Sequence, residues 1–505
     1  REVTAMGKQL RGLRRLLGEV DALSRAAALL SWDQQTYMPK GGAEGRSLQL
    51  STLSRLAHQR FTGTETGDLL RGAETETAGL DPDADDACLV RKTGREYRKQ
   101  TRVPGDWVSA FSRTTSLAHQ EWIQAREQAG YSLFQPRLEE ILRLRRGYAG
   151  FFTPCDHPYD PLLDDFEPGL KTAQVASVFG ELRPRQEELA RAIAEKTPAD
   201  NRFLHQRFDE KRQWELGLEI IRAFGFDFDR GRQDRSAHPF TTAFGRGDVR
   251  ITTRMQPGYL GTGLFGTMHE AGHALYEQGV DPALERTPLG GGASLALHES
   301  QSRLWENLVG RSRCFWKSCL PRLASVFPGQ LGGVDLERFY RGINRVMPSL
   351  IRVEADEATY NLHIMIRFDL EVALITGDLD TGQLPGAWNE AYQRTLGLTP
   401  PDHAVGVLQD VHWSGGMFGY FPTYALGNLI ASQLWEEVRR DIPDLDRQIE
   451  SMDFSGLLSW LRERIHRHGA KFEPLDLLRR ALGEGLSPRA YLGYLETKYG
   501  ELYGL

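Results

Sequence analysis

Apolar side chains recur every three to four residues along most of this chain, which is the spacing of one buried face on an α-helix. Leucine, alanine, glutamate and arginine, which favour helices, are abundant in these stretches. The pattern predicts helices over residues 5–33, 44–60, 84–130, 172–197, 205–225, 295–312, 353–377, 384–396, 422–440, 454–467 and 486–503. We therefore expect a mainly α-helical protein.

Three segments interrupt the helical pattern. Residues 62–86 are acidic and rich in glycine and threonine, and residues 154–169 hold four prolines, so both are expected to be irregular. Residues 238–255 contain two short β-prone runs on either side of a turn with glycine and aspartate. They predict a small sheet, which is either purely structural or offers an edge strand to an extended peptide.

The length of the chain, 505 residues, exceeds the size at which one hydrophobic core usually keeps growing. We expect a single unit over 1–505 with two lobes around one cleft, approximately 1–230 and 231–505. The formal net charge of −6 gives no indication of a nucleic acid or an anionic membrane as partner. No run of 18 apolar residues occurs, so no transmembrane helix is predicted.

The four cysteines are few and scattered for so long a chain, and none forms a C-x-x-C pair. This usage indicates a reducing compartment without a disulfide framework. The N-terminal segment has basic residues among its leucines but lacks the apolar core of a signal peptide. Both features predict a cytoplasmic protein.

The strongest chemical signal is the run His269-Glu270-Ala271-Gly272-His273. Residues four apart lie on one face of a helix, so both imidazoles can bind the same metal ion. Glu270 follows the first histidine, and its carboxylate can reach a water molecule on the open side of the metal. This is the H-E-x-x-H arrangement of zinc peptidases. A buried helix whose histidines are bound by neighbours is the alternative, but it explains neither the spacing nor the glutamate.

A catalytic zinc ion needs a third protein ligand. Metzincins take a histidine six residues after the second motif histidine, but that position is Gly279 here, so this class is excluded. The nearby carboxylates are Glu277, Glu285, Glu299 and Glu306. Glu299 is favoured, because it opens a helical segment after a glycine loop and 25 residues separate it from His273.

Two further clusters hold side chains that a peptidase could use. Arg352 can bind a carboxylate with two parallel donors, or it can pair with Asp356 one turn away. His412 can donate to a substrate or to a developing oxyanion. Tyr420 and Tyr424 follow a glycine-rich turn and are either phenol donors to that oxyanion or core tyrosines.

A series of motifs, in one order along the chain, resembles the thermostable, carboxypeptidase Taq-type zinc carboxypeptidases. Two similar stretches lie at 30–39 and 159–169, so the resemblance covers nearly the whole chain. The other motifs are His238-Pro239-Phe240, Asp248-Val249-Arg250-Ile251-Thr252, the H-E-x-x-H run, His298-Glu299-Ser300-Gln301, the segment 351–356 and the segment 406–413.

The resemblance implies a mostly helical fold with a small sheet beside a long, deep groove, and a homodimer. It implies removal of single residues from the free C-termini of peptides, with broad preference. The implied cofactor is one zinc ion per chain, for which cobalt could substitute. Two alternatives stay open from the residues alone: a metal-dependent oligoendopeptidase on a related helical scaffold, and a non-catalytic, metal-stabilised peptide-binding protein.

The resemblance also implies a set of site residues. The metal would be bound by His269, His273 and Glu299, with Glu270 as the general base.

The remaining candidates act on the substrate. His412, Tyr420 and Tyr424 are candidates to stabilise the oxyanion. Arg352 is the first candidate for the terminal carboxylate of the substrate and Arg250 the second. His238 is a further substrate-binding candidate.

Overall fold

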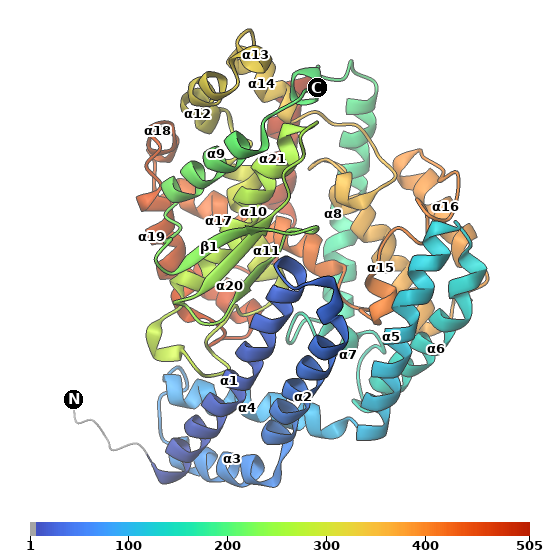
Figure 1. The fold of residues 1–505 in the computed structure, drawn as a ribbon, viewed down its shortest axis with the longest axis vertical. Helices are drawn as coiled ribbons and strands as arrows, with labels where there is room; N and C mark the ends of the chain where they lie inside the picture. Colours follow the sequence, from blue (N-terminus) through green and yellow to red (C-terminus); the bar gives the residue numbers. More distant parts are fainter. Residues whose placement is uncertain (1–6) are drawn as a thin grey trace.

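Helices make up nearly all of the regular structure in the computed structural model, which describes residues 7–505 (Figure 1). The mainly α-helical class is confirmed. In chain order the helices are α1 (Lys8–Thr36), α2 (Ala43–Thr62), α3 (Thr64–Thr77), α4 (Asp85–Arg102), α5 (Gly105–Glu127), α6 (Tyr131–Gly150), α7 (Asp160–Leu163), α8 (Thr172–Ala194), α9 (Glu210–Ala223), α10 (Leu260–Gly279), α11 (Leu295–Arg303), α12 (Arg313–Val326), α13 (Pro328–Leu331), α14 (Leu336–Ile343), α15 (Tyr360–Thr376), α16 (Leu384–Leu396), α17 (Pro422–Asp441), α18 (Leu445–Glu450), α19 (Ser455–Arg464), α20 (Pro474–Leu482) and α21 (Arg489–Tyr503). The first predicted helix begins at residue 5, and its first two residues lie outside the described part of the chain.

The predicted small sheet is confirmed, and it directly precedes α10. Its strands are β1 (Gly231–Arg235), β2 (Thr241–Ala243) and β3 (Val249–Thr253), in the order β1-β3-β2. β3 pairs in parallel with β1 and antiparallel with β2, so that Thr241 lies opposite Ile251. The sequence analysis missed β1, because its largely polar residues, Gly-Arg-Gln-Asp-Arg, have low strand propensity.

The prediction of an irregular loop over 62–86 is wrong, since α3 occupies most of it. Thr66, Leu70, Ala73 and Thr77 recur at helical spacing and are buried. Threonine and alanine are only weakly hydrophobic, so in these inward positions they give no clear helical pattern of apolar residues in the sequence. The helix predicted over 84–130 is divided at Pro104, which precedes α5. Helices α6 and α12 lay outside the prediction, and each contains an internal proline.

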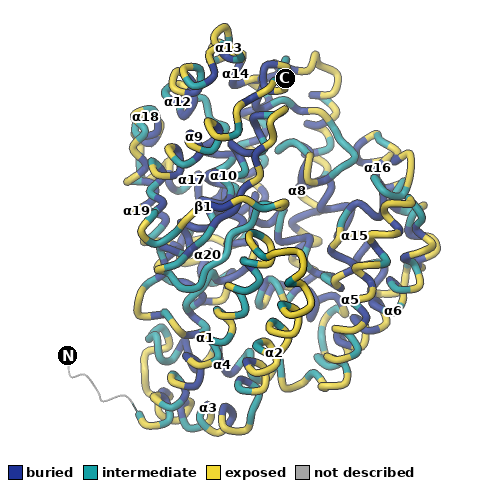
Figure 2. The backbone as a smooth tube through the Cα atoms, viewed as in Figure 1, coloured by how far each residue is buried: buried dark blue, intermediate teal, exposed yellow. Residues whose placement is uncertain are grey.

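Two hydrophobic cores hold the molecule together. The larger one contains buried side chains from Ala118 to Tyr503, and α10 and α17 are buried along most of their length within it (Figure 2). The smaller one joins α1–α4 to the segment 280–289 that follows α10. The lobe boundary near residue 230 stays a prediction.

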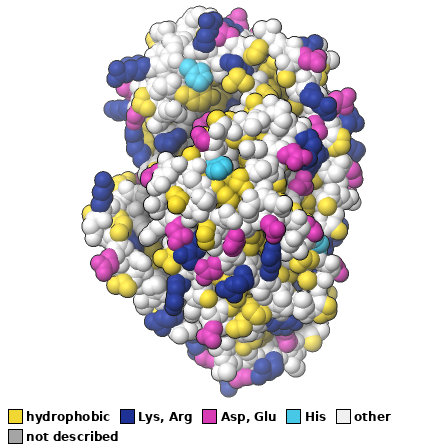
Figure 3. Space-filling model, turned by 90° about the vertical axis from the view of Figure 1, so that its right-hand side faces the viewer, with side chains coloured by type: hydrophobic (Ala, Val, Ile, Leu, Met, Phe, Trp, Pro, Cys, Tyr) yellow, Lys and Arg dark blue, Asp and Glu magenta, His cyan; other side chains and the backbone are white. Residues whose placement is uncertain are grey.

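The surface charges and the cysteines of the structure match what the composition of the chain indicated. On the face shown in Figure 3, basic and acidic side chains are interspersed without a large region of one sign. All four cysteines are free. No helix among residues 7–505 has the length and apolarity needed to cross a membrane.

Candidate metal centre

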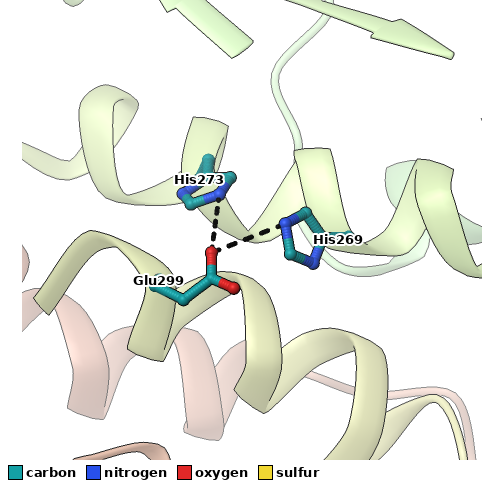
Figure 4. A group of neighbouring side chains, drawn as sticks. All are labelled: His269, His273 and Glu299. Atoms are coloured by element: carbon teal, nitrogen blue, oxygen red, sulfur yellow. Dashed lines mark ion pairs between the residues drawn. The ribbon is translucent and has the colours of Figure 1, made fainter. Parts of the chain in front are cut away.

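The side chains of His269, His273 and Glu299 converge between α10 and α11 (Figure 4). Oε2 of Glu299 lies 3.6 Å from Nε2 of His269 and 3.5 Å from Nε2 of His273. One donor atom from each side chain lies within 4.8 Å of the other two. The structure thus brings together the three residues that the sequence favoured, in a set of two imidazoles and one carboxylate that is typical of catalytic zinc.

Two glycines allow the helices to approach closely at this point. A Cβ atom on Gly272 of α10 would lie 2.6 Å from the carbonyl oxygen of Gln301 in α11. A Cβ atom on Gly427 of α17 would lie 2.6 Å from Cγ of Glu299. Both distances are far below an ordinary carbon contact, so a side chain at either position would displace α11 and its ligand.

Each motif histidine is held from behind by another polar side chain. Nδ1 of His269 lies 2.8 Å from Oε2 of Glu306. Nδ1 of His273 lies 2.7 Å from Nδ1 of His298, whose Nε2 is 2.7 Å from Oε1 of Glu277. These contacts orient both rings and leave their Nε2 atoms facing Glu299. Glu306 and Glu277, which the sequence analysis considered as ligands, instead contact the candidate ligand His269 and the neighbouring His298.

Glu299 is held in the same way. Arg303, one turn further along the helix, donates from Nε to Oε1 at 2.8 Å, and Ser302 donates to Oε2 at 3.1 Å. Burial disfavours the carboxylate form, but Arg303 and the two motif histidines outweigh burial and keep the pKa of Glu299 well below its usual range. The carboxylate of Glu299 is therefore ionised at neutral pH, as a candidate metal ligand must be.

The charges around the three side chains suit a cation. Burial opposes protonation of His269, yet Glu299, Glu306 and Glu270 raise its pKa to about 9. Burial is also the main reason that the pKa of His273 falls to about 4, so that imidazole is neutral at neutral pH. Carboxylates that stabilise added positive charge, together with this donor set, fit a divalent metal ion.

Glu270 is buried, with 6 % of its surface exposed, beside the three candidate ligands. The hydroxyl of Thr241, on the edge strand β2, donates to Oε2 of Glu270 at 2.6 Å. Burial raises the pKa of Glu270, which makes it a stronger base than an exposed glutamate. The sheet therefore positions this carboxylate, a contact that joins residues 29 apart and has no local signal in the sequence.

His412, Tyr420 and Tyr424 form one cluster. Nε2 of His412 lies 3.2 Å from the hydroxyl of Tyr424, and the ring of Tyr420 is centred 5.3 Å from each of the other two rings. Burial lowers the pKa of His412 to about 4, which leaves a neutral imidazole. Burial raises the pKa of both phenols, and the negative charge of Glu299 acts in the same direction.

Arg352 is buried and pairs with Asp410. Its Nε and Nη2 donate to Oδ1 of Asp410 at 3.0 and 2.8 Å, and its Nη1 donates to the hydroxyl of Tyr360 at 2.9 Å. The interpretation of Arg352 and Asp356 as an ion pair is wrong, because Asp356 accepts backbone N–H groups of Met347 and Thr359 instead. The side chain of Arg367 contacts the other oxygen of Asp410 at 2.6 Å.

The two other substrate-binding candidates lie at the sheet. Arg250 donates to both carboxylate oxygens of Asp248 at 2.8 Å, and its guanidinium is 4.4 Å from the ring centre of Trp32. His238 is exposed and precedes β2. Their roles in substrate binding stay predictions.

Several polar residues of the site escaped the sequence analysis. Arg303 follows Glu299 by four residues, a spacing that brings side chains together on a helix and that signals the pair. Arg367 and Glu371 are charged residues buried in the mainly apolar helix α15. Charged residues in such a helix need buried partners. The sequence thus indicates that a partner exists, but it does not indicate which residue is the partner.

Glu306→Gln is expected to weaken metal binding by about 10- to 100-fold, because an outer partner orients His269 and makes it a better ligand. Competition against a chelator of known affinity measures the change. Glu215→Gln, at an exposed position of α9, is the matched control and should bind metal like the wild type. Unchanged affinity in the Glu306 variant would contradict a role for this contact at the metal.

Comparison with known proteins places the whole chain in one family. Residues 12–499 match the model described as carboxypeptidase Taq (M32) metallopeptidase. Thermostable carboxypeptidase 1 of Thermus thermophilus is 43% identical over 496 residues, which cover 96% of this chain and 97% of that protein. Carboxypeptidase 1 of Bacillus subtilis is 39% identical over 489 residues, which cover 97% of each chain.

A solved structure agrees with these relatives. The M32 carboxypeptidase from Deinococcus radiodurans superposes with a TM-score of 0.96 at 42% identity, over 99% of this chain and 100% of that chain. The relatives support neither the oligoendopeptidase nor the non-catalytic alternative. The chain therefore belongs to the carboxypeptidase Taq (M32) family of metallopeptidases and is a metallocarboxypeptidase.

Proposed function

We propose that this metallocarboxypeptidase hydrolyses the C-terminal bond of peptides of varied sequence with one zinc ion held by His269, His273 and Glu299. The observation that carries the proposal is the convergence of three donor atoms within 4.8 Å beside the buried Glu270. When bound, zinc would lower the pKa of a water molecule towards about 7 and polarise the scissile carbonyl. Cobalt, with similar ligand preferences, is the proposed substitute.

Glu270 is the proposed general base. Its Oε2 accepts from Thr241, which leaves Oε1 to take a proton from the attacking water. The same group then passes the proton to the amine of the leaving residue. The neutral imidazole of the buried His412 and the half-buried phenols of Tyr420 and Tyr424 are the proposed donors to the oxyanion, since none carries a charge that would have to be neutralised.

Charge balance favours Arg352 over Arg250 as the site for the terminal carboxylate of the substrate. Two guanidiniums, those of Arg352 and Arg367, share the single carboxylate of Asp410. One buried positive charge in this cluster is thus left over, and a substrate carboxylate would balance it. Arg250, by contrast, has Asp248 as a one-to-one partner.

Arg352→Ala is expected to lower kcat/KM for a free-acid peptide by about 10- to 100-fold, the range of hydrogen bonds to a charged group, about 1.5–3 kcal/mol. The matching C-terminal amide, already a poor substrate, should lose much less. Arg352→Lys keeps the charge but not the two parallel donors, so it should still weaken binding.

The measurement is kcat/KM for the matched acid and amide, with Arg250→Ala as the control arginine. An equal loss on both substrates would mean that Arg352 serves only the structure and would move the assignment to Arg250. In the wild type, the acid should be cleaved with a much higher kcat/KM than the amide, whereas an endopeptidase would cleave both with similar kcat/KM.

Three further proposals concern the whole molecule. We propose a homodimer on the strength of the resemblance, and light scattering in solution measures its mass. We propose a cytoplasmic location, since four free cysteines suit a reducing compartment. We also propose that the chain forms two lobes, 1–230 and 231–505, with peptide substrates in the cleft between them.

A further inference from the structure

Glu371 of α15 is a fully buried carboxylate that forms no ion pair within 4.0 Å among residues 7–505, although the charge of Arg145 acts on it from further away. Three donors from other parts of the chain surround it. The indole Nε1 of Trp413 donates to Oε1 at 2.8 Å. The hydroxyl of Tyr159 and the backbone N–H of Gly419 donate to Oε2 at 2.6 and 3.0 Å. Nothing in the proposed mechanism uses this group directly.

Two of these bonds hold the segment that carries the proposed oxyanion donors. Trp413 directly follows His412, and Gly419 directly precedes Tyr420. One side chain therefore fixes the segment 412–420 next to both of these residues. Gly419 has φ of +93°, and a Cβ atom there would collide with the carbonyl oxygen of Leu162 in α7. The segment is thus packed closely against the connector that also supplies Tyr159.

The connector touches the same cluster a second time. The ring of Phe166 packs edge-on against Tyr420, with the ring centres 5.0 Å apart. Tyr159 and Phe166 therefore contact, directly or through Glu371, the segment between His412 and Tyr420. The connector 154–169 therefore packs against the segment 412–420.

A carboxylate in this place is costly to maintain. Burial raises the pKa of Glu371 to about 7, against the opposing effect of its three hydrogen bonds. An apolar side chain of similar size would fill the space without that cost, but it could not hold three donors from two chain segments. The buried carboxylate therefore indicates that the positions of its three donors need to be fixed.

We propose that Glu371 is a positioning residue of the peptidase reaction: its carboxylate fixes the segment 412–420, so that His412 and Tyr420 stay aligned as oxyanion donors. The inference rests on the proposed function, in which these two side chains stabilise the transition state. Aligned donors act on the rate of the chemical step more than on substrate affinity. Loss of Glu371 should therefore lower kcat and leave KM and bound metal largely unchanged.

The first variant is Glu371→Gln, which keeps the size of the side chain. One of its two terminal atoms becomes an amide nitrogen, so at least one donor loses its acceptor. We expect kcat to fall by about 10- to 100-fold, the effect of a small misplacement of catalytic groups. Metal content, measured on the same sample, should stay at the wild-type level.

The second variant is Tyr159→Phe, which removes one hydrogen bond and keeps the carboxylate. It also keeps the inference testable if Glu371→Gln fails to fold. Tyr131→Phe is the matched control: its buried hydroxyl donates at 2.8 Å to the carbonyl oxygen of Thr381, away from the 412–420 segment. We expect a smaller kcat loss in the Tyr159 variant than in Glu371→Gln, and wild-type kcat in the control.

The deciding experiment repeats Glu371→Gln in an enzyme that already carries His412→Ala and Tyr420→Phe. If Glu371 acts through these two donors, the further fold-loss in kcat should nearly vanish in that background. The same fold-loss in both backgrounds would overturn the proposal, as would wild-type kcat in Glu371→Gln and Tyr159→Phe. If the His412→Ala, Tyr420→Phe enzyme itself keeps wild-type kcat, the donor assignment is wrong and the inference falls with it.

Discussion

Glu270→Gln is expected to lower kcat by at least about 100-fold while the enzyme keeps its full metal content. Glutamine preserves the size of the side chain and can still accept the hydrogen bond from Thr241. It cannot accept the proton of the attacking water, because its amide is not basic. Burial, which raises the pKa of Glu270, is what makes the native carboxylate suited to that step.

The measurement is kcat on a free-acid peptide, with bound metal determined on the same sample. Glu285→Gln is the matched control: this glutamate, on the loop after α10, lies 3.6 Å from Arg25 and away from the ligand cluster. It should have wild-type kcat. Near-normal turnover by a metal-loaded Glu270 variant would rule out the general-base assignment.

Glu299→Ala is expected to remove most of the bound metal and, with it, nearly all turnover. Two imidazoles remain as metal donors. The loss of a direct ligand should weaken metal binding by more than the about 10- to 100-fold that follows the loss of one outer hydrogen-bond partner. Arg303 would also lose the acceptor that it contacts at 2.8 Å and would add positive charge beside the site. Both effects work against a cation.

Metal analysis after dialysis, followed by titration with zinc, measures this loss. His269→Ala and His273→Ala should behave in the same way, because each removes one of the three converging donors. Glu285→Ala serves as the control, because Glu285 lies on the loop after α10 and pairs with Arg25. Full metal and full activity in the Glu299 variant would show that the third ligand has been assigned to the wrong residue.

The part of the site that follows from helix geometry could be predicted from the sequence. The spacing of His269 and His273 fixes their common face once the segment is helical, and Glu270 comes with them. Glu299 needed one more step, a return of the chain through a glycine loop to a second helix. In the structure, the 15 residues 280–294 return the chain to α11, which brings Glu299 beside both histidines.

The supporting contacts could not be predicted in the same way. The acceptors and donors that hold the site come from distant segments: Thr241 reaches Glu270 from the sheet, and Asp410 reaches Arg352 from a loop 58 residues away. Sequence shows that a buried charge such as Arg367 needs a partner, but the fold decides which one. The same holds for α3, whose inward positions are filled partly by threonine and alanine.

The most direct test of a zinc carboxypeptidase centred on His269, His273 and Glu299 is a digest of a mixed peptide pool, read by mass spectrometry. Three samples are compared: chelated enzyme, the same enzyme after addition of zinc, and zinc-loaded Glu270→Gln. We expect single residues to be released from free C-termini only by the zinc-reloaded wild type, with amidated peptides intact. Internal cleavage, or undiminished release by the chelated enzyme, would contradict the assignment.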